Sequence, residues 1–296
     1  MEWFVFALLA PIAFAICNIF DKYILTKKLR DPFSYNIIAM MLGIIPLIFL
    51  PFLLNLTFDF SSLLAIFYGI SFAFLYVIYN KAMMKEEASR IISLMYTFPI
   101  FVTILSSIFL QEFLSTEKYL GIALLVLSAF LISYKKMGKK FTISIAIVLI
   151  LFYAFGTASM KVLTKYALNN IDYWSFFSWS LVGDLLGAFL LLIPSKIRKN
   201  FIKHMLEIDK KTLLIVLIAD LLSWVGYIFL FIATSIGKVS LVTALMSIQP
   251  LIVFMFTIIL TVRKPKILKE EINKTSLLFK SMAVILILVG SYLIMV

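Results

Sequence analysis

Residues 179–191 read WSLVGDLLGAFLL, a run of mostly apolar side chains that contains one acidic residue, Asp184. The run belongs to a longer apolar window, 174–194, and about 20 apolar residues in a helix are enough to cross the hydrocarbon core of a bilayer. A carboxylate near the bilayer centre costs about 2.5–3.5 kcal/mol on insertion scales. The stretch therefore predicts a membrane-spanning helix whose carboxylate faces a wet interior or a partner rather than lipid.

The rest of the chain has the same character. Of its 296 residues, 63% are hydrophobic and only 14% are charged, which is too little polar surface to cover a soluble core of this size. Windows of spanning length cover the chain and leave no stretch for a soluble domain. We therefore predict an all-α integral membrane protein with ten transmembrane helices. The windows lie near 3–25, 33–54, 62–81, 91–111, 118–134, 142–165, 174–194, 212–235, 239–261 and 277–296.

The scarcity of cysteine and histidine narrows the possible functions. A single cysteine, Cys17, excludes an intramolecular disulfide, and a single histidine, His204, argues against a His/Cys metal site. We expect no metal and no cofactor. A membrane-embedded enzyme needs a nucleophile with an activating base, and no histidine lies at membrane depth, so we expect no enzymatic activity. The first window is interpreted as a helix rather than a cleaved signal because Glu2 precedes it without any Lys or Arg.

The net charge of +12 follows a topological pattern. In a ten-helix arrangement, all but four of the 27 basic residues fall in loops on one side of the membrane. The positive-inside rule places these loops in the cytoplasm and both termini outside. We expect a multi-pass protein of the cell membrane, in contact with the lipid bilayer, and no nucleic-acid partner, because no basic domain with interleaved aromatic residues exists. The four exceptions are Lys118, Lys161, Lys165 and Lys238.

The two halves of the chain align weakly over every predicted helix. For example, GIALLVLSAFLI from Gly121 lies over AVILILVGSYLI from Ala283. Five helices per copy is an odd number, so the second copy enters the membrane with the opposite orientation. We predict two inverted five-helix repeats, 1–137 and 138–296, with a site between them that is exposed alternately to the two sides. The alternative is a duplication that built only a stable bundle. Further aligned pairs are Asn18 with Lys161, Lys22 with Lys165, Tyr76 with Tyr227, and Pro99 with Pro250.

Residues 93–132, SLMYTFPIFVTILSSIFLQEFLSTEKYLGIALLVLSAFLI, resemble the signature of the EamA-like family of the drug/metabolite transporter superfamily. That signature has a proline in the fourth helix, a Leu-x-Glu pair at its end, and a glycine that opens an aliphatic fifth helix. Here these are Pro99, Leu110, Glu112 and Gly121. The second copy departs from the pattern, because Arg263 takes the place of Glu112 and a charged insertion follows. The predicted outside termini are another departure.

The resemblance implies ten helices in two repeats and secondary-active movement of small metabolites, commonly export. We expect an alternating-access transporter of a small polar metabolite such as an amino acid or related compound, with protons as a candidate coupling ion. The sequence holds no ATP-binding motif of the Gly-x-x-x-x-Gly-Lys-Ser/Thr type. Two alternatives stay open: a flippase for a lipid-linked intermediate, and a non-transporting membrane sensor or scaffold. The sequence does not indicate an oligomeric state.

Side chains three or four apart share a helix face, so a polar stripe marks the side turned away from lipid. Asn18 and Asp21 share such a face, and Asp220 shares another with aromatic residues. At about 1.5 Å per residue, the depths of Lys161, Asp184 and Asp220 permit an ion pair or a shared-proton network. A structural charge pair, or a Lys161 that reaches the outer interface, is the alternative. The candidate substrate- or proton-binding residues are Asp184, Asp220, Lys161, Asn18, Tyr76, Tyr96, Trp224, Tyr227 and Ser247, and the candidate structural or gating residues are Pro99, Pro250 and Glu112.

Overall fold

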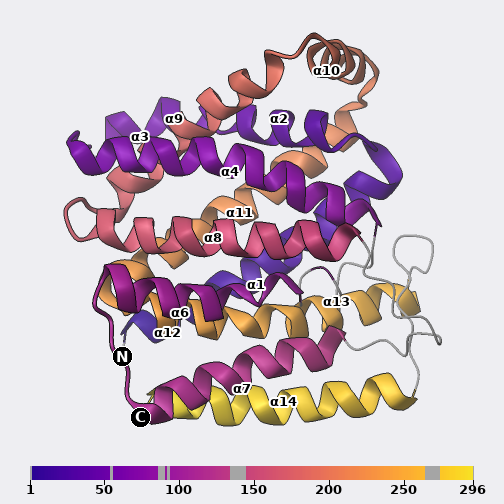
Figure 1. Cartoon of the computed structure of the whole chain (residues 1–296). Helices are drawn as coiled ribbons and strands as arrows, with labels where there is room; N and C mark the ends of the chain where they lie inside the picture. The colour runs from indigo at the N-terminus through magenta and orange to yellow at the C-terminus, as the bar shows by residue number, and fades with distance from the viewer. Residues whose placement is uncertain are drawn as a thin grey trace.

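The computed structural model describes residues 2–53, 56–85, 91, 94–133, 145–263 and 274–295. Throughout these ranges the regular structure is helical, as the sequence predicts (Figure 1). The predicted boundary between residues 137 and 138 lies outside the described residues, as does most of the charged insertion after Arg263. Both termini lie at the same end of the bundle (Figure 1).

The helices follow one another with short connections. In the first half they are α1 (Glu2–Tyr23), the π-helical continuation η1 (Ile24–Lys28), α2 (Pro32–Leu42), α3 (Ile44–Leu53), α4 (Phe60–Lys85), α6 (Phe98–Phe109) and α7 (Thr116–Ser133). In the second half they are α8 (Ile145–Leu168), α9 (Tyr173–Leu192), α10 (Ser195–Glu207), α11 (Lys210–Ile236), α12 (Val239–Leu245), the 3-10 turn η2 (Met246–Ile248), α13 (Gln249–Arg263) and α14 (Lys274–Met295).

Seven helical spans in the described part of the chain are long and apolar enough to cross a membrane. Two further apolar helical stretches, Phe98–Phe109 and Ser281–Met295, are shorter. The prediction of an all-helical, multi-pass membrane protein is confirmed, whereas the arrangement as ten spans in two inverted repeats stays a prediction. The seven spans are Glu2–Lys28, Pro32–Leu50, Phe60–Lys85, Val148–Leu168, Tyr173–Leu191, Lys210–Ile236 and Val239–Leu260.

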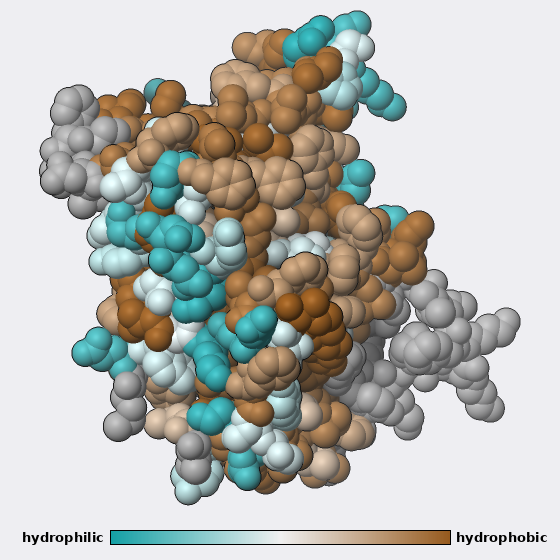
Figure 2. Space-filling model, turned by 60° about the vertical axis from the view of Figure 1, so that its left-hand side comes forward, coloured by the Kyte–Doolittle hydropathy of each residue, from teal (hydrophilic) through white to brown (hydrophobic). Residues whose placement is uncertain are grey.

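The outside of the bundle has the apolar character expected of a surface in lipid. Large hydrophobic side chains such as Phe67, Phe152 and Tyr292 are exposed, with half or more of their area accessible. Figure 2 shows hydrophobic residues over most of the visible surface and hydrophilic residues gathered in a band. Because a soluble protein rarely exposes so large an apolar area, this surface fits contact with acyl chains.

Glycines let helices from the two halves pack backbone against backbone. Helix α4 packs along α9, where a Cβ at Gly69 would lie 2.1 Å from the Ser180 carbonyl oxygen, and one at Gly183 would lie 2.1 Å from that of Ile66. Helices α7 and α14 lie side by side (Figure 1) and mainly contact each other. Closely approaching helices that lack side chains at the crossing are typical of membrane bundles.

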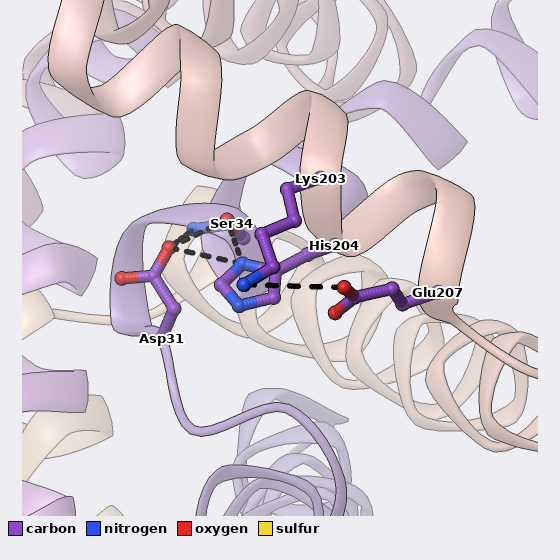
Figure 3. Close-up of polar contacts among 5 residues, drawn as sticks. All are labelled: Asp31, Ser34, Lys203, His204 and Glu207. Carbon is purple, nitrogen blue, oxygen red and sulfur yellow. Dashed lines mark hydrogen bonds and ion pairs between the residues drawn. The ribbon is translucent and has the colours of Figure 1, made fainter.

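Helix α10 is an element that the sequence analysis treated as a loop. It is basic, none of its residues is fully buried, and it is seen almost along its axis while the long helices run across the view (Figure 1). His204 contacts the start of α2, with its Nδ1 3.0 Å from Ser34 Oγ and 3.7 Å from Asp31 Oδ2 (Figure 3). Asp31 also accepts a hydrogen bond from the Ser34 backbone N–H, which caps α2 just before Pro32.

Candidate functional site

A cavity lies between α1, α2, α4, α9 and α11. Its walls are rich in aromatic rings, and several of the predicted site residues meet there. Those residues are Asn18, Tyr76, Asp184, Asp220, Trp224 and Tyr227.

The charged groups of this cavity are all acidic. Asp21 of α1, Asp184 of α9 and Asp220 of α11 line it, and no Lys, Arg or His occurs among its described lining residues. Asp184 has no hydrogen bond or ion pair with any described residue. The Oδ2 atom of Asp220 is buried and has no hydrogen-bond partner there either. Two carboxylates thus lack protein partners, although a buried polar group without a partner costs about 1–3 kcal/mol.

Asp21 differs from the other two carboxylates because the protein surrounds it with donors. It accepts hydrogen bonds from Tyr35 OH at 2.5 Å and from Tyr79 OH at 3.4 Å, and the thiol of Cys17 lies 3.8 Å away. Tyr35 and Cys17 line the same cavity. Asp21 is therefore held in place by the protein, whereas Asp184 and Asp220 have no such donors among the described residues.

A chain of hydrogen bonds leads from Asp21 into the second half of the molecule. Tyr79 OH, which donates to Asp21, accepts from Asn18 Nδ2 at 2.9 Å. Asn18 Oδ1 accepts from Gln249 Nε2, and Gln249 Oε1 accepts from Tyr96 OH. These five side chains are buried and come from α1, α4, α13 and the segment before α6.

A second cavity is lined by Lys161 and Tyr96. Lys161 is 8% exposed and forms no hydrogen bond or ion pair with any described residue, and its Nζ lies 5.8 Å from the centre of the Phe98 ring. The predicted ion pair of Lys161 with Asp184 or Asp220 is therefore wrong, because Lys161 lines this second cavity and the two carboxylates line the first. The depth estimate placed the three residues along the membrane normal but carried no information about their lateral separation.

The two cavities adjoin each other. Five residues line both of them, including two tyrosines whose hydroxyl groups are hydrogen-bonded to each other. Those tyrosines, Tyr76 and Tyr227, are an aligned pair of the predicted repeats. The polar interior thus has an acidic part and a basic part that border on the same five residues. The shared residues are Phe14, Asn18, Phe72, Tyr76 and Tyr227.

The two prolines begin helices rather than bend them. Pro99 follows a turn at Tyr96 and Thr97 and stands in the first turn of α6, and Pro250 is the second residue of α13, after the 3-10 turn η2. Proline is well tolerated there because the first backbone N–H groups of a helix have no intrahelical acceptor. Ser247 lies in η2 with a buried hydroxyl that has no partner among the described residues, and it lines neither of the two cavities.

Glu112 fastens the end of α6 to the start of α12. Its carboxylate accepts hydrogen bonds from the Val239 backbone N–H at 3.3 Å and from Ser240 Oγ at 3.1 Å. Lys238 Nζ donates to the Phe113 carbonyl oxygen at 2.7 Å in the same place. Glu112 is buried, and its contacts support the structural role that the sequence suggests for it.

We expect Glu112→Ala to lower the free energy of unfolding by about 1–3 kcal/mol, because the buried Val239 N–H loses its acceptor and the Ser240 hydroxyl keeps only Ser106 as a partner. Thermal unfolding in detergent, followed by tryptophan fluorescence, measures the change. Glu117→Ala is the control, since Glu117 is exposed at the start of α7. Equal melting temperatures for the two variants contradict the assigned role.

Sequence reasoning gave too little weight to several members of the site. Asp21 carried a usable signal, because it shares a helix face with Asn18. No such signal marked Tyr35, Tyr79 and Gln249. The sequence contains many other tyrosines and uncharged polar residues, and nothing in the pattern distinguishes these three. Their partners come from distant parts of the chain, as with Gln249 and Asn18, which are 231 residues apart.

Comparison with known proteins agrees with this architecture. Residues 1–134 match the sequence model of the EamA-like transporter family, which confirms the resemblance found in residues 93–132. Among solved structures, one described only as "Crystal structure of protein" has a TM-score of 0.64 and 15% sequence identity, and the match covers 97% of this chain and 95% of that one. At this identity the match shows a shared fold. No curated protein matches the chain.

Proposed function

Because residues 1–134 match the sequence model of the EamA-like transporter family, we propose that this protein is a secondary-active transporter that exports a small polar metabolite, such as an amino acid or a related compound. The observation that carries the proposal is the aromatic-lined cavity in which Asp184 and Asp220 have no partner among the residues that the structure describes. Buried carboxylates without a partner favour a ligand that brings positive charge, either an amine or a coupling proton.

The aromatic lining supports the same kind of ligand. Tyr68, Phe72, Trp224 and Tyr227 line the cavity together with the carboxylates. An ammonium group is attracted by the faces of such rings by about 0.5–2 kcal/mol. The hydroxyl of Tyr68 is also buried without a partner among the described residues, so the wall offers a hydrogen-bonding group in addition to its rings.

The transport cycle that we propose is alternating access by two inverted five-helix repeats. Equivalent hydrogen bonds in the two halves support the repeats. Lys22 Nζ donates to the Met83 carbonyl oxygen at 2.6 Å, and Lys165 Nζ donates to that of Thr234 at 2.9 Å. The repeat alignment places Lys22 over Lys165, and the offset that relates the paired tyrosines also places Met83 over Thr234.

Unequal packing of equivalent helix pairs supports alternation. In the proposed repeats α4 corresponds to α11, and α9 corresponds to α2. Helix α4 packs closely along α9, whereas α11 has few contacts with α2, and the cavity lies between these two. In the proposed rocking motion α4 separates from α9 while α11 closes on α2. The cavity then opens to the other side of the membrane. From the loop charges we propose that the basic loops lie in the cytoplasm and that both termini lie outside.

An efflux assay in proteoliposomes tests the function. Vesicles that hold a mixed pool of amines and amino acids are placed under a pH gradient, and mass spectrometry follows what leaves. We expect the native protein to release one compound class and Asp184→Asn and Asp220→Asn to release no more than empty vesicles. Asp209→Asn is the matched control, because Asp209 is exposed at the start of α11 and asparagine also caps helices well. Identical leakage from native and empty vesicles refutes solute export and favours the flippase or scaffold alternatives.

A further inference from the structure

The basic part of the interior has the features of a site for an anionic group. Lys161 supplies an ammonium group, and Thr157 lies four residues earlier on the same face of α8. Thr157 is 4% exposed, and its hydroxyl lies near the Tyr153 side chain without forming a well-aligned hydrogen bond with a described residue. Lys161, Thr157 and Tyr153 all line the second cavity. No Asp or Glu occurs among the described residues that line this cavity.

The acidic part is the complement of this site. Asp184 and Asp220 lack partners there, as Lys161 and Thr157 do in the basic part. Protein interiors rarely leave buried charges and hydroxyls unpaired, because each such group loses its hydration without compensation. The carboxylates of the acidic part favour a cationic group, and the Lys161 ammonium group of the basic part favours an anionic group. The two parts belong to adjoining cavities that share Phe72, Tyr76 and Tyr227.

We propose that the substrate is an elongated zwitterion, with an amine at one end of a short carbon chain and a carboxylate at the other. This inference rests on the proposed function and specifies its substrate class. The amine lies at Asp184 and Asp220, the carboxylate lies at Lys161 and Thr157, and the apolar middle passes the aromatic side chains that the two cavities share. The class is that of the ω-amino acids.

The geometry disfavours an ordinary α-amino acid. Its amine and carboxylate are attached to the same carbon, so an amine bound at Asp184 and Asp220 leaves the carboxylate beside the same two negative charges. No cation is present among the described residues of that cavity to offset the repulsion. Moving the carboxylate to the far end of the chain places it near Lys161 instead.

Calorimetric titration of the purified protein tests the proposal with three series of probes. These are unbranched ω-amino acids of increasing length, alkylamines of matched length, and α-amino acids. We expect the best ω-amino acid to bind about tenfold or more tightly than its matched alkylamine, the difference being a charge-assisted interaction with Lys161. Lys161→Gln removes that preference, Lys161→Arg retains it, and Thr157→Val reduces it. Lys203→Gln, on the exposed surface of α10, leaves it unchanged.

The outcomes separate this inference from the proposed function. If native protein binds alkylamines as tightly as ω-amino acids, or α-amino acids more tightly than either, the elongated zwitterion is refuted and an amine-binding transporter remains. A preference that survives in Lys161→Gln also refutes it. If no probe from any series binds, both the substrate class and the proposed cavity function fail. Should Lys161→Gln not fold, Thr157→Val tests the same site, with Lys161→Arg as the control that keeps the charge; a preference that Thr157→Val leaves undiminished then refutes the proposal.

Discussion

Gly69→Ala is expected to lower the free energy of unfolding by more than about 3 kcal/mol. The new Cβ would lie 2.1 Å from the Ser180 carbonyl oxygen and 2.5 Å from the Asp184 backbone nitrogen. Both atoms belong to the backbone of α9, which cannot move aside as the end of a flexible side chain can. The two helices must separate along their whole interface, and the packing contacts between α4 and α9 are lost.

Thermal unfolding in detergent measures this effect, and we expect a decrease in melting temperature on the order of 10 °C. Gly43→Ala is the matched control. Its Cβ would lie 3.0 Å from the Met40 carbonyl oxygen, one turn earlier, and 3.4 Å from a methyl group of Leu181, so we expect little change. If the two variants melt at the same temperature, the close approach of α4 and α9 is not what holds the halves together.

Gln249→Leu is expected to lower the free energy of unfolding by about 2–6 kcal/mol, because it leaves two buried groups unpaired at about 1–3 kcal/mol each. The Tyr96 hydroxyl loses its acceptor and Asn18 Oδ1 loses its donor. Gln249 itself is 2% exposed, so water does not replace the missing partners. Leucine preserves the approximate volume, which separates this loss from the cost of a cavity.

A double-mutant cycle checks that the loss comes from the hydrogen bonds. Tyr96→Phe removes the hydroxyl that Gln249→Leu would leave unpaired. We therefore expect the double variant to be more stable than the sum of the two single effects predicts, by about 1–2 kcal/mol. Strict additivity, or a Gln249→Leu variant as stable as native protein, contradicts the assigned contacts.

The sequence was most informative where one physical signal dominates. Long apolar windows and the low charge content predicted a helical membrane protein, because a helix that crosses a bilayer needs about 20 mostly apolar residues. Helix α10 was not predicted, because a search for apolar windows finds only membrane-spanning helices. Its sequence, SKIRKNFIKHMLE, has no apolar run and was interpreted as a loop. Pro99 and Pro250 were predicted to be structural or gating residues, but periodicity alone does not show that each of them begins a helix.

The candidate site was harder to predict because it depends on lateral positions. Asp184 and Asp220 stood out as single charges within apolar windows, and the structure places both at one cavity. Counting residues gave Lys161 a compatible depth but could not show that it faces a different cavity. Gln249 gave no signal at all, since its role comes from partners 153 and 231 residues away in the chain.

The hydrogen-bonded chain from Tyr96 to Asp21 has a direction as well as a path. Tyr96 donates to Gln249, Gln249 to Asn18, Asn18 to Tyr79, and Tyr79 to Asp21, so every donor points toward the same carboxylate. In such a series each dipole polarises the next, and the members strengthen one another. A hydroxyl that turns away at the Tyr96 end leaves the Gln249 Oε1 atom without its donor, so the orientation of each member bears on the hydrogen bonding of the next. The basic and acidic parts of the interior are thus joined by one directed series of hydrogen bonds.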